Sequence, residues 1–117
     1  MEIIAIPSYR DGGLNEIFHP LFGKCDSFTF ITIDNNEITQ VRVIENSAAG
    51  ESQSRGTLAA KIINNNDAEK LIVSKLGANA SMALNTLQIK TFHAPDRKIL
   101  VKDLLELYLK GKIEMTP

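Results

Sequence analysis

The sequence predicts an α/β fold: one mixed five-stranded sheet with helices on both faces. Two observations support this. In the second half of the chain, strand-length apolar runs alternate with helical patterns, and such strand–helix–strand units make neighbouring strands parallel. In the first half, residues 34–37 (Asp-Asn-Asn-Glu) separate two strand-like segments. Asn tolerates the positive φ of a tight turn, so these residues indicate an antiparallel hairpin.

The first half is expected to supply three strands. Residues 2–7 form a short apolar run that Pro7 stops, which is typical of a strand buried on both faces. Glycine and proline make residues 8–24 irregular. The hairpin strands are expected at 27–34 and 38–45.

The third strand is expected near an edge of the sheet. Val41 and Val43 alternate with Gln40 and Arg42. Successive side chains of a strand point to opposite faces, so this pattern predicts one apolar and one polar face.

The second half is expected to alternate helices and strands. The expected elements are a helix at 56–65, a strand at 71–73, a helix at 79–87, a strand at 89–93 and a closing helix. Asn79 and Asp96 are the expected N-caps of the last two helices, and Gly111 is expected to end the chain's final helix. Strand two, at residues 27–34, is then expected to be the one strand of the five that runs opposite to the others.

Composition points to a single soluble domain spanning residues 1–117. The net charge is −1 with scattered basic residues, and only 6% of residues are aromatic, which argues against a nucleic-acid partner. No apolar run approaches the roughly 18 residues that span a bilayer, and the first residues do not resemble a signal peptide. With Cys25 as the only cysteine, no internal disulfide forms, and a reducing, cytoplasmic location is expected.

Polar chemistry is expected to gather at the carboxyl ends of the parallel strands, where open α/β sheets bind ligands. The start of the reversed strand two lies on the same rim. Seven cationic, imidazole or thiol side chains belong to the segments that meet there. They are Arg10, His19, Lys24, Cys25, Arg55, Lys75 and His93. Two helices also begin there, near Gly56 and Asn79, and helix N-termini attract anions. The rim therefore suits an anionic ligand.

Four segments together resemble the nitrogenase iron–molybdenum cofactor-binding family. Residues 21–28 (Leu-Phe-Gly-Lys-Cys-Asp-Ser-Phe) are similar to its Phe-Gly-Arg-x-x-x-Phe signature. Residues 43–49 (Val-Ile-Glu-Asn-Ser-Ala-Ala) resemble its Val-Ile-Glu-Asn-Pro-Ala loop, and residues 77–80 (Gly-Ala-Asn-Ala) its Gly-Pro-Asn-Ala turn. The closing helix, ending at 109–112 (Leu-Lys-Gly-Lys), also matches. The resemblance runs from about residue 3 to residue 112.

The resemblance implies a three-layer α/β/α sandwich of the ribonuclease H-like kind, with sheet order 3-2-1-4-5 and strand two antiparallel. It also implies a non-catalytic accessory or carrier protein of cofactor assembly, with an anionic iron–sulfur or iron–molybdenum type cluster as ligand and a protein partner. The expected cofactor-binding residues are Phe22, Gly23, Lys24, Arg55, Gly56, Gly77 and Asn79. Cys25 and His19 are the expected metal ligands.

The chain departs from the family pattern at three places. Leu21 stands where many members have His, and Ala78 where Pro is common. Residues 51–56 replace a glycine-rich stretch.

Each site residue also has a purely structural interpretation. Cys25 fits a buried residue at a strand start, and Phe22 fits the core. A loop His such as His19 is often solvated. Gly23, Gly56 and Gly77 fit turns, and the cations fit an ordinary charged surface.

Two alternative functions remain at this point. The first is a protein-interaction or regulatory domain that has lost the cluster. The second is a hydrolase that uses rim carboxylates or Cys25. The hydrolase is disfavoured because the first strand has no central Asp for a metal site and Glu2 lies at its wrong end.

Overall fold

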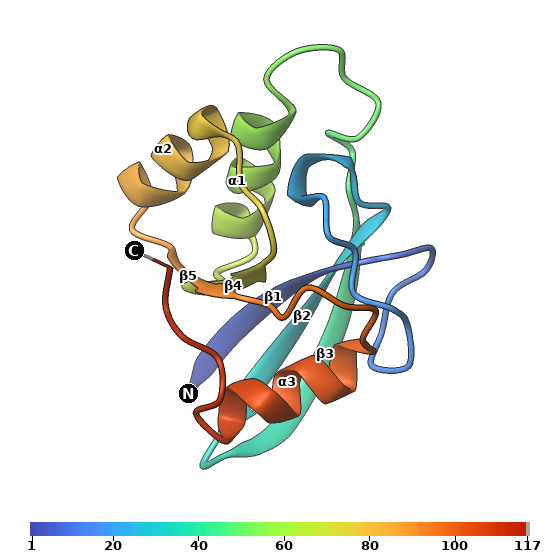
Figure 1. Cartoon of the computed structure of the whole chain (residues 1–117), viewed down its shortest axis with the longest axis vertical. Helices are drawn as coiled ribbons and strands as arrows, with labels where there is room; N and C mark the ends of the chain where they lie inside the picture. Colours follow the sequence, from blue (N-terminus) through green and yellow to red (C-terminus); the bar gives the residue numbers. More distant parts are fainter. Residues whose placement is uncertain (117) are drawn as a thin grey trace.

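The computed structural model describes residues 1–116 and contains one five-stranded sheet (Figure 1). The strand order is β3-β2-β1-β4-β5, with β1 antiparallel to β2 and parallel to β4. The strands are β1 (Glu2–Ser8), β2 (Ser27–Asp34), β3 (Glu37–Glu45), β4 (Lys70–Val73) and β5 (Lys90–His93). This confirms the expected sheet order and the reversed second strand.

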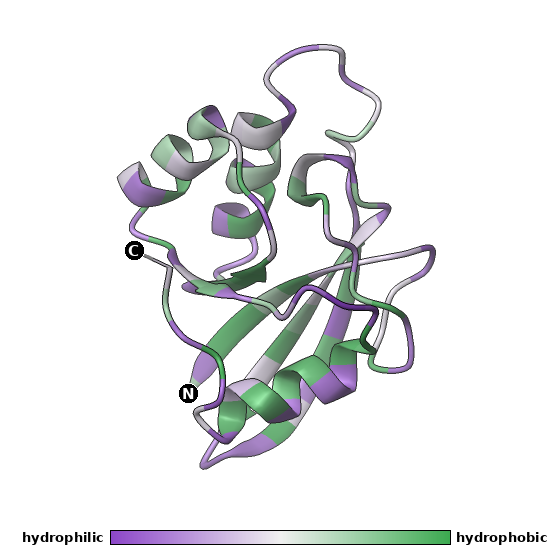
Figure 2. Ribbon diagram, in the orientation of Figure 1, coloured by the Kyte–Doolittle hydropathy of each residue, from purple (hydrophilic) through white to green (hydrophobic). Residues whose placement is uncertain are grey.

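Helices cover both faces of the sheet, as expected. The helices α1 (Arg55–Asn65) and α2 (Ala78–Thr86) lie on one face, and α3 (Val101–Leu109) lies on the other (Figure 1). Hydrophobic and hydrophilic residues alternate around α3, which is typical of a helix with one side on a core (Figure 2). A short 3₁₀ helix, η1 (Phe22–Lys24), interrupts the segment that was expected to be irregular.

The sheet separates two hydrophobic cores. On β1, Ala5 contributes to the core under α1 and α2, whereas Ile4 and Ile6 contribute to the core under α3. This is the alternation that the pleat of a strand requires. The strand is buried on both faces, as its unbroken apolar run indicated.

β3 is an edge strand, as its half-polar pattern predicted. Val41 and Val43 remain 38% and 39% exposed. Arg42 points to the other face, where its guanidinium lies over the Phe30 ring and donates to the Asn66 carbonyl oxygen (3.0 Å).

Both expected N-caps were wrong. Gly77 caps α2, so Asn79 lies inside the first turn, and Leu100 caps α3, four residues after Asp96. Neighbouring backbone takes the place of a side-chain cap at α3. The amides of Val101 and Lys102 donate to the carbonyl oxygens of Glu16 and Leu14 (2.8 and 2.9 Å), so two of the orphan N–H groups of the first turn are satisfied.

The helices α1 and α2 touch at their N-termini through Gly56. A Cβ atom added there would lie 2.6 Å from the Ala80 Cβ and 3.2 Å from the Ala80 Cα. A glycine lets the two helix starts approach this closely. Gly23 brings η1 near the same point, because its added Cβ would lie 3.3 Å from the Arg55 Cβ.

Gly56→Ala should therefore lower the free energy of unfolding by about 1–3 kcal/mol, because the added methyl overlaps a helix rather than a flexible side chain. Gly50→Ala is the matched control, since nothing lies within 4 Å of its added Cβ. It should change stability by less than about 0.5 kcal/mol. Urea unfolding of both variants measures the difference, and equal stabilities would show that the helix starts are not in close contact.

Candidate functional site

Residues 17–24 cross the rim where the parallel strands end. The His19 amide donates to the Pro7 carbonyl oxygen (2.9 Å), and Leu21 forms a parallel bridge with Lys75 just beyond β4. Asn46, which follows β3, donates to the Cys25 carbonyl oxygen (2.9 Å). The rim segments are thus joined to one another by hydrogen bonds.

A pocket of ≈ 490 Å³ lies where η1 meets the starts of α1 and α2. We call it the anion pocket. Its walls are residues 21–24, 52–56 and 75–80. All seven expected cofactor-binding residues line it: Phe22, Gly23, Lys24, Arg55, Gly56, Gly77 and Asn79. The structure therefore brings together residues that are up to 57 positions apart in the sequence.

The charge of the anion pocket is entirely positive. Lys24, Arg55 and Lys75 line it, and no Asp or Glu is among its described lining residues. Lys24 and Lys75 are exposed, and Arg55 is half-buried, with Nη1 donating to the Glu51 carbonyl oxygen (2.9 Å). Because no described carboxylate lines the pocket, the charges of these three cations remain available to a bound anion.

Both helix N-termini are open. Neither α1 nor α2 has a side-chain cap hydrogen bond. The first amides of a helix have no acceptor within the helix, so their N–H groups and the positive end of the helix dipole remain available. Three cations and two open N-termini suit a multiply charged anion.

Phe22 contributes little side-chain surface to the anion pocket. It is 3% exposed, and its ring packs 5.5 Å from the Phe28 ring. The core interpretation of this side chain is therefore confirmed, and Phe22 fixes η1 on the sheet.

Cys25 does not line the anion pocket. It is 0% exposed, and its Sγ donates to the Phe22 carbonyl oxygen (3.3 Å). Burial raises the pKa of the Cys25 thiol to about 12. A thiol in this setting is protonated and poorly nucleophilic at neutral pH.

His19 also lies outside the lining of the anion pocket. Its Nδ1 accepts from the Leu21 amide (3.0 Å), and its ring lies 4.2 Å from the Tyr9 ring. Partial burial lowers the pKa of His19 below 6.5. Its Nε2 is the nitrogen that a metal could reach.

Two other rim residues do not join the site. Arg10 pairs with Glu16 (3.1 Å), and His93 lines a separate pocket with the C-terminal segment 112–116. Within residues 1–116, no group of three or more His, Cys, Asp or Glu side chains is placed to hold a metal ion. No helix in this part of the chain is long and apolar enough to cross a bilayer.

Sequence reasoning missed the contribution of residues 52–54. These small polar residues form one wall of the anion pocket. Their composition indicates a loop, but not where that loop folds. Ser54 takes a left-handed conformation (φ 61°, ψ 23°) at the start of α1, which a non-glycine residue seldom adopts.

Comparison with known proteins identifies the family. The model of the family described as dinitrogenase iron-molybdenum cofactor matches residues 2–111. The uncharacterized protein MJ0580 of Methanocaldococcus jannaschii is 32% identical over 100 residues, covering 86% of this chain and 83% of that protein.

Solved structures share the fold. The apo form of the orange protein from Desulfovibrio gigas superposes with a TM-score of 0.87 at 24% identity, covering 99% of this chain and 93% of that one. TM1290 from Thermotoga gives a TM-score of 0.80 at 23% identity, covering 98% and 93%. The chain belongs to the dinitrogenase iron-molybdenum cofactor family.

Proposed function

We propose that this protein is a non-catalytic binding or carrier protein for an anionic metal cluster of the iron–sulfur or iron–molybdenum type. The cluster is its cargo, held in the anion pocket. One observation carries the proposal: three cations and two uncapped helix N-termini converge there without a lining carboxylate. The family description supports the metal content of the cargo.

The donor set fits a cluster that arrives with its own sulfides. The outer sulfides of such a cluster accept hydrogen bonds, and the pocket offers amide, guanidinium and ammonium donors. Among the residues that the structure describes, no thiol or imidazole lines the pocket. Lys24, Arg55 and Lys75 would neutralise the charge, and the amides at Gly56 and Asn79 would orient the cluster. This arrangement favours reversible holding, which a carrier needs.

Metal ligation by Cys25 and His19 stays a prediction. The two residues flank η1, but the Cys25 thiol is buried. Ligation by Cys25 therefore requires residues 22–25 to move away from the sheet. We propose that Cys25 acts mainly in packing and that the charges of the pocket do the binding.

The carrier role includes a protein partner that delivers or accepts the cluster, and it suits a reducing cytoplasm, where metal–sulfide clusters survive.

A second candidate is a regulatory or protein-interaction domain without a cluster. Leu21 favours it, because this residue stands 48% exposed where many family members have a potential histidine ligand.

Removing single charges from the anion pocket should weaken binding of tetrathiomolybdate, a soluble molybdenum–sulfide dianion. Each of Lys24→Gln, Arg55→Gln and Lys75→Gln should raise the dissociation constant roughly two- to fivefold, the effect of one charge that is at least partly exposed. Anaerobic equilibrium dialysis measures this. Lys90→Gln, at the opposite end of the sheet, is the matched control and should bind like wild type. Equal binding by all four variants would rule out the anion pocket.

Anaerobic reconstitution with iron and sulfide tests the cargo directly. We expect a new visible absorption band in the wild type and in Cys25→Ser, because the charges rather than the thiol hold the cluster. A band lost only in Cys25→Ser would instead establish thiolate ligation. The absence of a band in the wild type would contradict cluster carriage and favour the regulatory candidate.

The Cys25 thiol should react slowly with Ellman's reagent at pH 8. The thiol is buried and its pKa is about 12, so the rate should be at least about 100-fold below that of the same protein unfolded in guanidinium chloride. The raised pKa also means that the folded protein favours the protonated thiol. This contribution to the free energy of unfolding is fully present below the unfolded thiol pKa, near 9, and is lost as the pH rises toward 12. A thiol that titrates within seconds in the folded protein would show that residues 22–25 open readily.

A further inference from the structure

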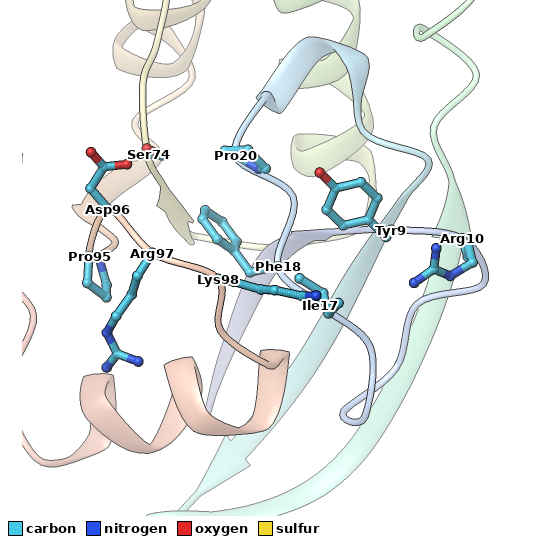
Figure 3. Close-up of a pocket in the computed structure, with 10 residues that line it drawn as sticks. All are labelled: Tyr9, Arg10, Ile17, Phe18, Pro20, Ser74, Pro95, Asp96, Arg97 and Lys98. Carbon is cyan, nitrogen blue, oxygen red and sulfur yellow. The ribbon is translucent and has the colours of Figure 1, made fainter.

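A second pocket, of ≈ 560 Å³, lies on the α3 side of residues 17–24 (Figure 3). It shares no lining residue with the anion pocket. Pro20 lines this second pocket, and the next residue, Leu21, lines the anion pocket. The complete lining consists of Tyr9, Arg10, Ile17, Phe18, Pro20, Ser74, Pro95, Asp96, Arg97 and Lys98. We call it the rim pocket.

Backbone hydrogen bonds fix the walls of the rim pocket. The Tyr9 amide donates to the Ile17 carbonyl oxygen (3.1 Å), and the Phe18 amide donates to the Ile99 carbonyl oxygen (2.8 Å). The Ala94 amide donates to the Val73 carbonyl oxygen (2.7 Å). The pocket is therefore preformed although loops build it, and its volume lies within the range of small-molecule sites.

Rings form the apolar part of the rim pocket. The half-buried Tyr9 and the exposed Pro20 supply its ring surface, and Phe18, which is 4% exposed, adds little (Figure 3). The Tyr9 ring is held against His19, 4.2 Å away between centroids. A rigid aromatic face such as that of Tyr9 complements a flat apolar ligand, because aromatic pairs stack in offset or edge-to-face geometry.

Three cations, Arg10, Arg97 and Lys98, and one carboxylate, Asp96, line the rim pocket. In Figure 3 the Asp96 carboxylate lies apart from the Lys98 ammonium, so it does not cover that cation. Arg10 is already paired with Glu16 (3.1 Å). In Figure 3, Arg97 points toward α3, away from the rings, whereas Lys98 extends toward Ile17. Within residues 1–116, neither Lys98 nor Arg97 takes part in an ion pair. Lys98 therefore offers a single ammonium beside the ring-lined wall.

We propose that the rim pocket is a second binding site, for a small aromatic monocarboxylate. The rings would hold the flat apolar body and the Lys98 ammonium would hold the carboxylate. The site differs chemically from the anion pocket, which has two open helix N-termini and no carboxylate among its described lining residues. At α3, by contrast, the amides of Val101 and Lys102 are bonded to the carbonyl oxygens of Glu16 and Leu14, so no comparable anion cradle exists there.

Two-dimensional ¹H–¹⁵N NMR with 2-naphthoate tests the proposal on the full chain. Amide shifts should concentrate at residues 9–18 and 95–98 and leave residues 54–56 and 77–79 unchanged. The neutral analogue 2-naphthamide should bind about tenfold more weakly, because it lacks the charge that Lys98 recognises. Lys98→Met should remove most of this preference, whereas the anion-pocket control Lys75→Met should keep it.

Three results would overturn the proposal. One is the absence of shifts up to about 10 mM 2-naphthoate, a concentration that reveals even weak binding. Another is a set of shifts centred on residues 54–56 and 77–79, which would show that 2-naphthoate binds in the anion pocket instead. The third is equal affinity for the acid and the amide, which would leave only non-specific apolar contact.

Discussion

The pairing of β1 along both of its edges is the constraint on which the rest of the structure depends. β1 is antiparallel to β2 through seven consecutive residue pairs, and parallel to β4 on the other side. Because β2 runs in reverse, its first residues come to the same rim as the last residues of β1, β4 and β5. Residues 17–24 must then cross that rim to reach β2. Shifting the β1–β2 register by one residue would exchange the faces of every β2 side chain and separate η1 from α1 and α2.

The chemistry of the rim follows from how residues 17–24 divide it. On one side, η1 lies against two helix starts that Gly56 and Ala80 hold in contact. Their amide groups and the cations produce a concentrated positive field there. On the other side, α3 begins with amides already bonded to a loop, and the rim pocket has ring side chains and the Asp96 carboxylate among its lining cations. The same strand order therefore produces one strongly electrostatic pocket and one mixed apolar pocket, and these suit different ligands.

Patterns that depend on neighbouring residues could be predicted from the sequence. The Asn-Asn hairpin, the two-sided burial of β1 and the edge position of β3 are all encoded in short segments. Seven of the residues that line the anion pocket could also be placed together, because the topology and the family motifs point to the same rim. Helix starts were harder. Asn79 and Asp96 are good capping residues, but backbone carbonyls from Leu14 and Glu16 cap α3 instead. The burial of Cys25 was one of the two interpretations that its place at a strand start allowed, and the structure confirms it. The existence of the rim pocket depends on long-range packing that no local pattern reports.

We propose that this protein holds a metal–sulfide anion at the open helix starts of α1 and α2. The most direct measurement is an amide-resolved NMR titration with tetrathiomolybdate under anaerobic conditions. The account predicts saturable shifts of the Arg55, Gly56, Ala78 and Asn79 amides, with smaller changes elsewhere on the rim. Shifts confined to residues 95–98, or spread evenly over the surface, would contradict it.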